Sequence, residues 1–467
     1  MMKWIFGLLL AVTVIQPMRA QDLAGRLKDA VRQMEADSQM KHALLGFYVA
    51  DDRTGEVMMN HHGDIGLAPA SCQKLITSVA AFELLGPDYR YKTSLQSHGR
   101  IENGALEGDL ILAGAGDPTL GSWRWPSTTD SLLMKEFSAA IASKGIRNIA
   151  GDFVASNSNF ETQLTPGGWI WDDIGNYYGA GATALNWHEN QYDLYLQPGP
   201  KVGDSVRILK TVPILRVSKI INELKTGPRG SGDNGYIFCA SDAVIASVRG
   251  TIPLGENPFV ISGSFPDPSY AAVADLSNYF ESAGIKIRGR ARVDWNKIAD
   301  SSKLQTLLTH YSPSLDSINY WFLKRSINLY GECLLKTMAL EKTGLGSTEK
   351  GIDIVQDFWE ERGIDRDGIN LMDGSGLSPQ NRVTPHSLVQ VLHYAGTRPW
   401  FGKFYDALPE INNLHMKSGS IGGARSYAGY VQSSNGHRYC FAMIVNNYSG
   451  SSAAIIRKMW KVLDNLK

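Results

Sequence analysis

The sequence predicts a multidomain protein of the α+β class, in which a domain of helices and sheet is split in two by a β-rich insertion. With 467 residues, the chain is too long for one compact domain. Helical patterns occur before about residue 95 and resume after about residue 310. Between them lie mainly short β-like runs broken by Gly, Pro and Asn. This change and its reversal predict the insertion.

The first 20 residues have the features of an export signal. Lys3 gives a basic start, an apolar run covers residues 5–15, and the small residue Ala20 precedes Gln21. The apolar run is too short to span a bilayer, and no later run is apolar enough to do so. We therefore expect an exported protein without a transmembrane segment after signal removal. An uncleaved anchor is the alternative.

Charge and cysteine content exclude several classes of protein. Lys and Arg number 46 and Asp and Glu number 46, which argues against a nucleic-acid partner. The four cysteines form no CxxC pair, so a zinc ribbon is disfavoured and four buried thiols are expected: Cys72, Cys239, Cys333 and Cys440. None of the 10 histidines lies in an HExxH motif, which argues against a metallopeptidase.

Local patterns predict the individual elements in order. Residues 22–42 suggest a surface helix, and residues 43–60 a β-hairpin around a turn at 51–55. A buried helix should start near Pro69 and stop at Gly86-Pro87, because its apolar residues cover most of its surface. Further expected elements are β-runs within 99–120 and 145–160, a helix within 267–285, and a hairpin of 426–432 with 438–446.

A serine followed three residues later by a lysine occurs three times in the chain. Ser38 lies in a polar segment with Lys41, and Ser347 in a turn-rich loop with Lys350. Only Ser71 and Lys74 combine a helix start with apolar surroundings, and their spacing puts both side chains on one helix face. The alternative is that Lys74 extends from the helix end to water.

The chemistry of acyl transfer favours a functional role for Ser71 and Lys74. A serine hydroxyl becomes a good nucleophile when a base takes its proton. A lysine can be that base only when neutral, and its ordinary pKa is about 10.4. Burial and a second ammonium group nearby lower a lysine pKa. We therefore expect Ser71 to be the nucleophile and Lys74 a buried base.

A second motif should supply another hydroxyl and an amide. The triplet Ser-Ile-Asn occurs at 317–319 and at 326–328, and the second copy lies in a segment with an apolar helical face. Ser326 would relay a proton between Lys74 and the leaving amine, and Asn328 would hydrogen-bond a substrate amide. The alternative is a pair of capping or surface polar residues.

A third motif should place a lysine, a hydroxyl and a glycine on a strand. Two literal Lys-Thr-Gly copies occur. The copy at 225–227 looks like a polar loop before Pro228, and the copy at 342–344 looks like a helix C-terminus with its glycine cap. The better candidate is residues 417–420, at the start of a strand. Lys417 would be the second cation, Ser418 would bind a carboxylate, and Gly419 would let a ligand backbone approach. The backbone N–H groups of Ser420 and Ser71 would form an oxyanion hole.

Together and in this order, these motifs resemble those of the penicillin-binding proteins and serine β-lactamases. More narrowly, the chain resembles the DacB-type D-alanyl-D-alanine carboxypeptidases, known as penicillin-binding protein 4 or peptidase family S13. The similarity covers nearly all of the mature chain. Its blocks are "PASCQKLITSVAAFELLGPDYRYKT", "GDLILAGAGDPTL", "KRSINLYGECLLK", "MDGSGLSPQNRVTP" and "KSGSIGGARSYAGYV".

The resemblance implies a transpeptidase/β-lactamase-like catalytic domain, a sheet flanked by helices, interrupted by nested β-rich insertions. The implied divisions are a signal peptide (1–20), the catalytic domain (21–95 and 301–467), an inserted domain II (96–165 and 266–300) and a nested domain III (166–265). It also implies a periplasmic or cell-envelope enzyme, soluble or peripheral.

The resemblance also implies an activity: a serine D-Ala-D-Ala carboxypeptidase, with endopeptidase activity as an addition, acting on peptidoglycan stem peptides through an acyl-enzyme. No metal or other cofactor is expected, and β-lactam antibiotics would be covalent inhibitors. Ser71 would attack, Lys74 would accept its proton, and Ser326 would pass a proton to the leaving amine. Lys417 would hold charge and Asn328 would orient the acyl chain. Asp373 and Ser375 would line the pocket.

Two other classes stay open at this point. One is a different acyl-serine hydrolase of the same fold, such as a β-lactamase or an esterase, although the long β-rich insertion argues against a β-lactamase. The other is a non-catalytic cell-wall-binding protein, although all three motifs keep their functional groups. The sequence also leaves open whether the chain forms a homo-oligomer and which third stem residue it would prefer.

Overall fold

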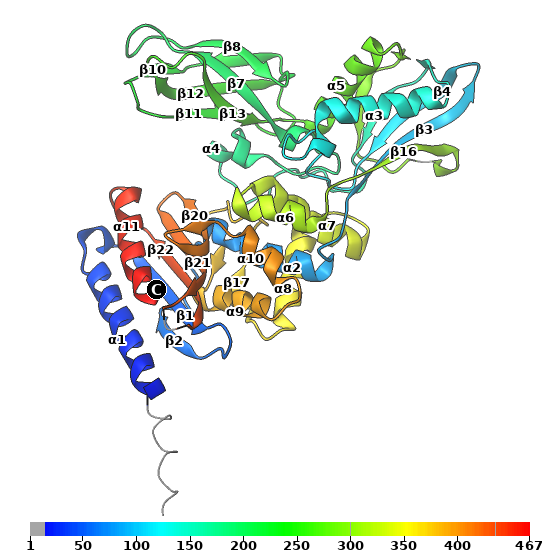
Figure 1. The fold of residues 1–467 in the computed structure, drawn as a ribbon. Coiled ribbons are helices and arrows are strands. Elements are labelled where there is room, and N and C mark those ends of the chain that lie inside the picture. Colours follow the sequence, from blue (N-terminus) through cyan, green and yellow to red (C-terminus); the bar gives the residue numbers. More distant parts are fainter. Residues whose placement is uncertain (1–14, 299, 435) are drawn as a thin grey trace, which may run out of the picture. The chain divides into compact units, whose positions relative to one another are not determined.

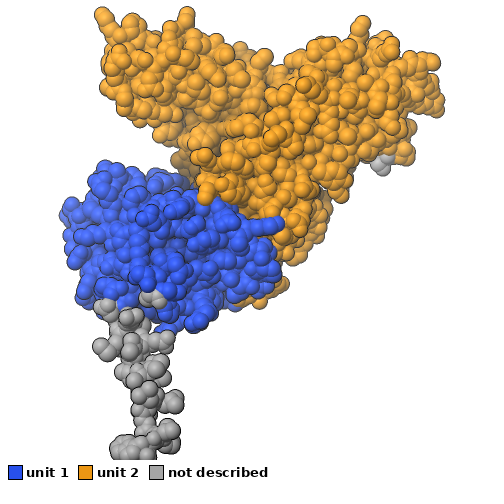
Figure 2. All heavy atoms as spheres, in the orientation of Figure 1, with its two compact units in different colours: residues 1–76, 363–370, 381–467 blue, residues 77–362, 371–380 orange. Residues whose placement is uncertain are grey.

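The computed structural model describes residues 15–298, 300–434 and 436–467. Most of the expected signal peptide, residues 1–14, therefore lies outside the described part. The chain divides into two compact units, coloured separately in Figure 2: unit 1 is residues 1–76, 363–370 and 381–467, and unit 2 is residues 77–362 and 371–380. Among the described residues, no helix combines the length and hydropathy that crossing a membrane requires.

Unit 1 is built on one antiparallel sheet of six strands, in the order β19-β20-β21-β22-β1-β2. The strands are β1 (Leu44–Asp51), β2 (Val57–His61), β19 (Glu410–Ile411), β20 (Leu414–Ile421), β21 (Ala424–Gln432) and β22 (Arg438–Asn446). Both predicted hairpins are confirmed. The strand that carries Lys417 begins earlier than expected, at Leu414, so the third motif lies inside β20.

Helices cover this sheet because its strands supply apolar side chains to a continuous core. Helices α1 (Ile15–Glu35) and α11 (Ser452–Leu463) lie side by side on the sheet (Figure 1), and their apolar residues share one core with those of β1 and β22. Helix α9 (Pro385–Gly396) packs on β1 and β22, and α10 (Phe401–Ala407) packs on α9. The short strands β17 (Ile369–Asn370) and β18 (Arg382–Val383) pair with each other. The predicted surface helix is therefore half-buried: Leu23, Leu27, Val31 and Met34 are buried in this core.

The largest sheet of unit 2 has seven strands and combines segments far apart in the sequence. Its path is β14-β5-β4-β3-β16, with β6 paired to both β4 and β15. The strands are β3 (Lys92–Glu102), β4 (Ala105–Ala113), β5 (Asn148–Ile149), β6 (Phe153–Ser156), β14 (Lys286–Ile287), β15 (Ala291–Asp294) and β16 (Leu304–Tyr311). Helix α5 (Pro268–Ser282) contacts β6 and β15, and α3 (Asp130–Ser143) contacts β16 and α5. The predicted helix within 267–285 is confirmed, with Asp267 capping its first turn.

Two smaller sheets are formed by the chain between these segments. One has the order β13-β7-β8; in the other, β12 pairs with β9, β10 and β11. The strands are β7 (Gln191–Gln197), β8 (Arg207–Val212), β9 (Lys219–Asn222), β10 (Lys225–Gly227), β11 (Asn234–Phe238), β12 (Ile245–Pro253) and β13 (Phe259–Ser264). The expectation of a polar loop at 225–227 is wrong. These residues pair with β12 and end just before Pro228, which cannot donate to a ladder. The proposed domain boundaries stay predictions.

The remaining helices of unit 2 include the second motif. They are α4 (Trp171–Ile174), α6 (Leu315–Lys324), α7 (Asn328–Thr343) and α8 (Thr348–Glu360). Gly344 ends α7 with φ of 81°, which confirms the predicted glycine cap. The apolar segment at 320–340 belongs to two helices, and Ser326 lies in the break between them. Helix α2 (Lys74–Leu84) begins in unit 1 and continues into unit 2, as the chain does at residue 77.

Candidate active site

Ser71 lies in a short 3-10 turn, Ala70–Gln73, that leads directly into α2. The helix predicted from Pro69 therefore begins with a tighter turn than expected. The residue before the serine, Ala70, is fully buried and has φ of 46°. A left-handed conformation is unfavourable for alanine, so the surrounding structure must hold this turn in place.

Strands β21 and β22 supply the groups that hold the turn. The side-chain amide of Asn446 accepts from the Ala68 amide N–H at 2.8 Å and donates to the Ala68 carbonyl at 3.2 Å. The Ser426 hydroxyl donates to the Pro69 carbonyl at 2.5 Å. These bonds satisfy backbone groups that a buried irregular segment would otherwise leave unpaired. The nucleophile turn is thus fixed by the two central strands of the unit 1 sheet.

Ser71 and Lys74 are in direct contact. The Lys74 ammonium nitrogen donates to the Ser71 hydroxyl oxygen at 2.9 Å, and Lys74 has no exposed surface. The alternative that Lys74 extends to water is wrong. Burying an ammonium group is costly unless it is compensated, so a lysine here is held in position for its contacts and not for solvation. The geometry suits proton transfer from the serine oxygen to a neutral amine.

Gly419 of β20 packs against the nucleophile turn. A Cβ at this position would lie 2.5 Å from the Pro69 carbonyl oxygen and 2.9 Å from the Ser71 nitrogen. The glycine therefore permits close approach of two parts of this chain, a reason the sequence did not reveal. It also sets the Ser71 backbone N–H beside β20, where the N–H of Ser420 was expected to be its partner in an oxyanion hole.

Lys417 is a second buried amine in the same unit. It is 1% exposed, and burial lowers its pKa to about 8, with the Cys72 thiol raising it and the nearby Arg425 guanidinium lowering it. Its ammonium nitrogen donates to the Ser418 carbonyl at 2.8 Å. Near neutral pH most of this group is therefore cationic, as binding of a carboxylate requires.

Cys72, which follows the proposed nucleophile, contacts the backbone of Lys417. Its thiol donates to the Lys417 carbonyl oxygen at 3.2 Å, and burial raises its pKa, so it stays a neutral thiol. All four cysteines are free and buried, which confirms the expectation of four buried thiols. Of the two serines of the third motif, Ser418 is half-buried and Ser420 is exposed.

Arg425 is a charged neighbour that the sequence analysis missed. It pairs opposite Ser420 in the β20–β21 ladder, and its Nε is buried without a hydrogen-bond partner. The hairpin was expected to begin at residue 426, which left Arg425 in the turn. Had the strand been extended one residue toward its N-terminus, Arg425 would have been placed in the sheet.

In unit 2, Ser326 occupies a strained position between α6 and α7. It is half-buried and has φ of 58°. Left-handed backbone is uncommon for serine, and such strain is concentrated at functional sites. The break separates the serine from the regular hydrogen bonding of both helices, a feature that periodicity alone could not reveal.

Asn328 begins α7 and is held by a distant segment. Its side-chain N–H donates to the Tyr178 carbonyl at 2.8 Å, and the residue is 9% exposed. Tyr178 lies in the short 3-10 turn Tyr177–Gly179, which no motif singled out. The contact fixes the orientation of the Asn328 amide.

Asp373 organises the loop in which it lies. Its carboxylate accepts from the indole N–H of Trp169 at 2.9 Å and from the backbone N–H groups of Gly376 and Ser378, each at 2.7 Å. Ser375 in the same loop is fully buried. Asp373 has no exposed surface either, and its hydrogen bonds to Gly376 and Ser378 hold the loop in shape.

The loop at 371–380 packs on α7. A Cβ at Gly374 would lie 2.3 Å from the Gly331 carbonyl oxygen, and the Gly374 N–H donates to the Glu332 carboxylate at 3.0 Å.

The first Ser-Ile-Asn copy is structural: Ser317 accepts from the indole of Trp125, and Asn319 accepts from Ser78.

The predicted residues thus form two groups. Unit 1 brings together Ser71, Lys74 and residues 417–420, and unit 2 holds Ser326, Asn328, Asp373 and Ser375 around the start of α7. A serine hydroxyl and a buried lysine in contact, beside a second buried lysine on a strand, are typical of the serine hydrolases that have a transpeptidase-like fold.

The chain belongs to the D-Ala-D-Ala carboxypeptidase 3 (S13) family, whose model matches residues 27–466. It is 26% identical to the D-alanyl-D-alanine carboxypeptidase of Actinomadura sp. over 96% of this chain and 87% of that protein. It is also 26% identical to the D-alanyl-D-alanine carboxypeptidase DacB of Haemophilus influenzae, over 87% of this chain and 86% of that protein.

A solved structure agrees in fold. The crystal structure of penicillin binding protein 4 (dacB) from Haemophilus influenzae superposes with a TM-score of 0.79, at 24% identity, over 96% of this chain and 98% of that chain. These matches confirm the predicted family, fold class and enzyme class.

Proposed function

We propose that the chain removes the terminal D-alanine of peptidoglycan stem peptides through an acyl-enzyme formed on Ser71. Its membership of the S13 family of D-Ala-D-Ala carboxypeptidases supports the reaction, and the 2.9 Å contact between Ser71 and Lys74 supports the assignment of nucleophile and base. That contact is the single observation on which the residue assignment depends.

In this mechanism, Lys74 takes the proton of Ser71 as the hydroxyl attacks the carbonyl of the penultimate D-alanine. The backbone N–H groups of Ser71 and Ser420 stabilise the oxyanion, where each donor typically contributes about 2.7–4 kcal/mol. Ser326 passes a proton to the departing amine of the last D-alanine. Water then hydrolyses the ester, which frees Ser71.

Substrate recognition falls to the remaining residues. Lys417, buried and cationic near neutral pH, attracts the terminal carboxylate, with the Ser418 hydroxyl as a hydrogen-bond donor to it. The side-chain amide of Asn328, which Tyr178 orients, forms a hydrogen bond with the acyl-side amide of the stem peptide. Asp373 shapes the loop beside α7 through its hydrogen bonds to Gly376 and Ser378, and this loop, which also holds Ser375, forms a wall of the pocket.

β-Lactams are expected to acylate the same serine, because they present a strained amide and a carboxylate in place of the dipeptide. A structure of the Haemophilus penicillin binding protein 4 with a novel β-lactam shows such a ligand in a protein of this fold. Hydrolysis of peptide cross-links, an endopeptidase reaction, uses the same chemistry and is part of the proposal. We also propose that residues 1–20 direct the enzyme to the cell envelope.

Mass spectrometry after incubation with benzylpenicillin tests the nucleophile. Trypsin should release residues 54–74, in which Ser71 is the single serine. We expect the penicilloyl adduct on this peptide, its loss in Ser71→Ala, and its retention in the matched control Ser38→Ala, whose serine is exposed. An adduct on another peptide would contradict the assignment. Release of D-alanine from a stem pentapeptide tests the reaction itself.

A further inference from the structure

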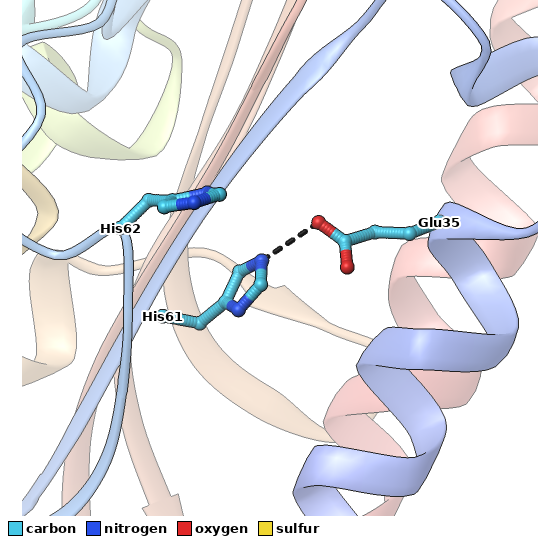
Figure 3. A group of neighbouring side chains, drawn as sticks. All are labelled: Glu35, His61 and His62. Atoms are coloured by element: carbon cyan, nitrogen blue, oxygen red, sulfur yellow. Dashed lines mark hydrogen bonds and ion pairs between the residues drawn. The ribbon is translucent and has the colours of Figure 1, made fainter.

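Outside the proposed active-site residues, three side chains of unit 1 gather at the end of β2 (Figure 3). Glu35 is the last residue of α1, His61 is the last residue of β2, and His62 follows it. One ligand atom from each lies within 4.8 Å of the other two. The cluster joins the first helix to the sheet strand beside it.

The backbone brings the two histidines onto one side. Consecutive residues of a strand point to opposite faces, so neighbouring histidines in a regular strand could not share a ligand. His62, however, has φ of 51°, and its ring centroid lies 4.3 Å from that of His61. Histidine is one of the residue types that adopt left-handed backbone more often than most, and this departure from the strand conformation is what makes the cluster possible.

A hydrogen bond orients the His62 ring as the ring of a metal ligand is oriented. The Nδ1 of His62 contacts the Leu45 carbonyl oxygen at 3.1 Å, so Nδ1 carries the proton and Nε2 keeps its lone pair. Metal-bound histidines almost always donate the N–H of the second ring nitrogen to a carboxylate, a backbone carbonyl or a water molecule. The Nε2 of His61 lies 2.7 Å from Oε1 of Glu35.

We propose that Glu35, His61 and His62 bind one zinc ion, with water as the fourth ligand. Two imidazole nitrogens and one carboxylate oxygen suit Zn²⁺, whereas Ca²⁺ and Mg²⁺ prefer oxygen ligands alone. Bonds of 2.0–2.1 Å in a tetrahedral site separate ligand atoms by about 3.3 Å. The His61–Glu35 contact would therefore open slightly, and the longest separation between ligand atoms, which is within 4.8 Å, would close by at most about 1.5 Å.

The side chains have room for this adjustment. The side chain of Glu35 is 35% exposed and that of His61 is 24% exposed, so a hydrated cation can reach them. Zinc takes the place of the proton between His61 and Glu35, and that proton moves to Nδ1 of His61 or to solvent. The ion would tie the C-terminal end of α1 to β2, a structural role apart from catalysis.

Zinc titration of the purified mature protein, with any affinity tag removed, tests the proposal. We expect one equivalent bound, at least tenfold weaker binding in His62→Asn and in Glu35→Gln, and unchanged binding in His42→Ala. Asparagine tolerates left-handed backbone, so His62→Asn keeps the turn. His42 is an exposed histidine outside the cluster and serves as the matched control.

Two results would overturn the proposal: no saturable binding of Zn²⁺ at 100 times the protein concentration, or equal affinity in the wild type and in the variants. Should the variants misfold, X-ray absorption of the wild-type zinc protein decides. Two imidazole nitrogens and an oxygen at about 2.0–2.1 Å support the site, whereas sulfur ligation or oxygen ligands alone contradict it.

Discussion

Replacing Lys417 by methionine should stabilise the folded chain, although it removes a residue proposed to bind substrate. The lysine is 1% exposed, and burial lowers its pKa from 10.5 to about 8. The difference of about 2.5 pH units, at about 1.36 kcal/mol each, corresponds to roughly 3 kcal/mol of destabilisation while the group is charged. Methionine has a similar volume and carries no charge.

The sign of the pH dependence follows from proton binding. Between pH 8 and 10.5 the unfolded chain holds a proton at this position that the folded chain has released, so stability rises with pH there. The penalty is fully present below pH 8 and absent above 10.5. Loss of the hydrogen bond to the Ser418 carbonyl costs about 1 kcal/mol. We expect Lys417→Met to gain about 2 kcal/mol at pH 7 and almost nothing at pH 9.5.

Urea unfolding followed by circular dichroism at the two pH values measures this difference. Lys336→Met is the contrasting control, because Lys336 is also buried but lies 3.6 Å from the Glu161 carboxylate. Burial lowers the pKa of Lys336 as well, so the loss of its charge alone would be favourable. Removing it, however, takes the cation from Glu161, which keeps the Thr348 N–H, and takes the donor from the carbonyls of Gln163 and Ala182, so Lys336→Met should be less stable than the wild type. The reasoning is refuted if Lys417→Met is less stable than the wild type at pH 7, or if its effect does not change with pH.

Three further predictions concern the catalytic residues. Lys74→Met should stay folded but lose penicillin acylation, because Ser71 loses its base; labelling with fluorescent penicillin measures this, and acylation at the wild-type rate would contradict it. Gly419→Ala should lose penicillin acylation and about 1–3 kcal/mol of stability, because its Cβ would lie 2.5 Å from the Pro69 carbonyl oxygen. Gly422→Ala is the matched control: a Cβ there has no atom within 4 Å, so acylation and unfolding free energy should both be unchanged. Acylation by a β-lactam that carries a carboxylate should slow as pH rises past about 8, where Lys417 loses its charge, and a stopped-flow profile flat to pH 10 would count against this role.

The sequence by itself identified the family and most of the local structure. Hairpins, the glycine cap at Gly344 and the helix within 267–285 depend on periodicity and turn residues, which are local. The three motifs could be found because few other kinds of protein combine these residue types, at these spacings, in one chain. Decoys such as Ser347 and the first Ser-Ile-Asn copy were set aside on local context alone.

The tertiary structure decided those properties that depend on contacts between distant segments of the chain. Burial of Lys74, the break at Ser326 and the need for glycine at 419 arise from packing between residues far apart in the chain. The pKa of Lys417 and the pairing of His61 with Glu35 likewise depend on neighbours that no local pattern specifies. The sequence determines which chemical groups are present, but the burial and the partners that shift their pKa values exist only once the chain is folded.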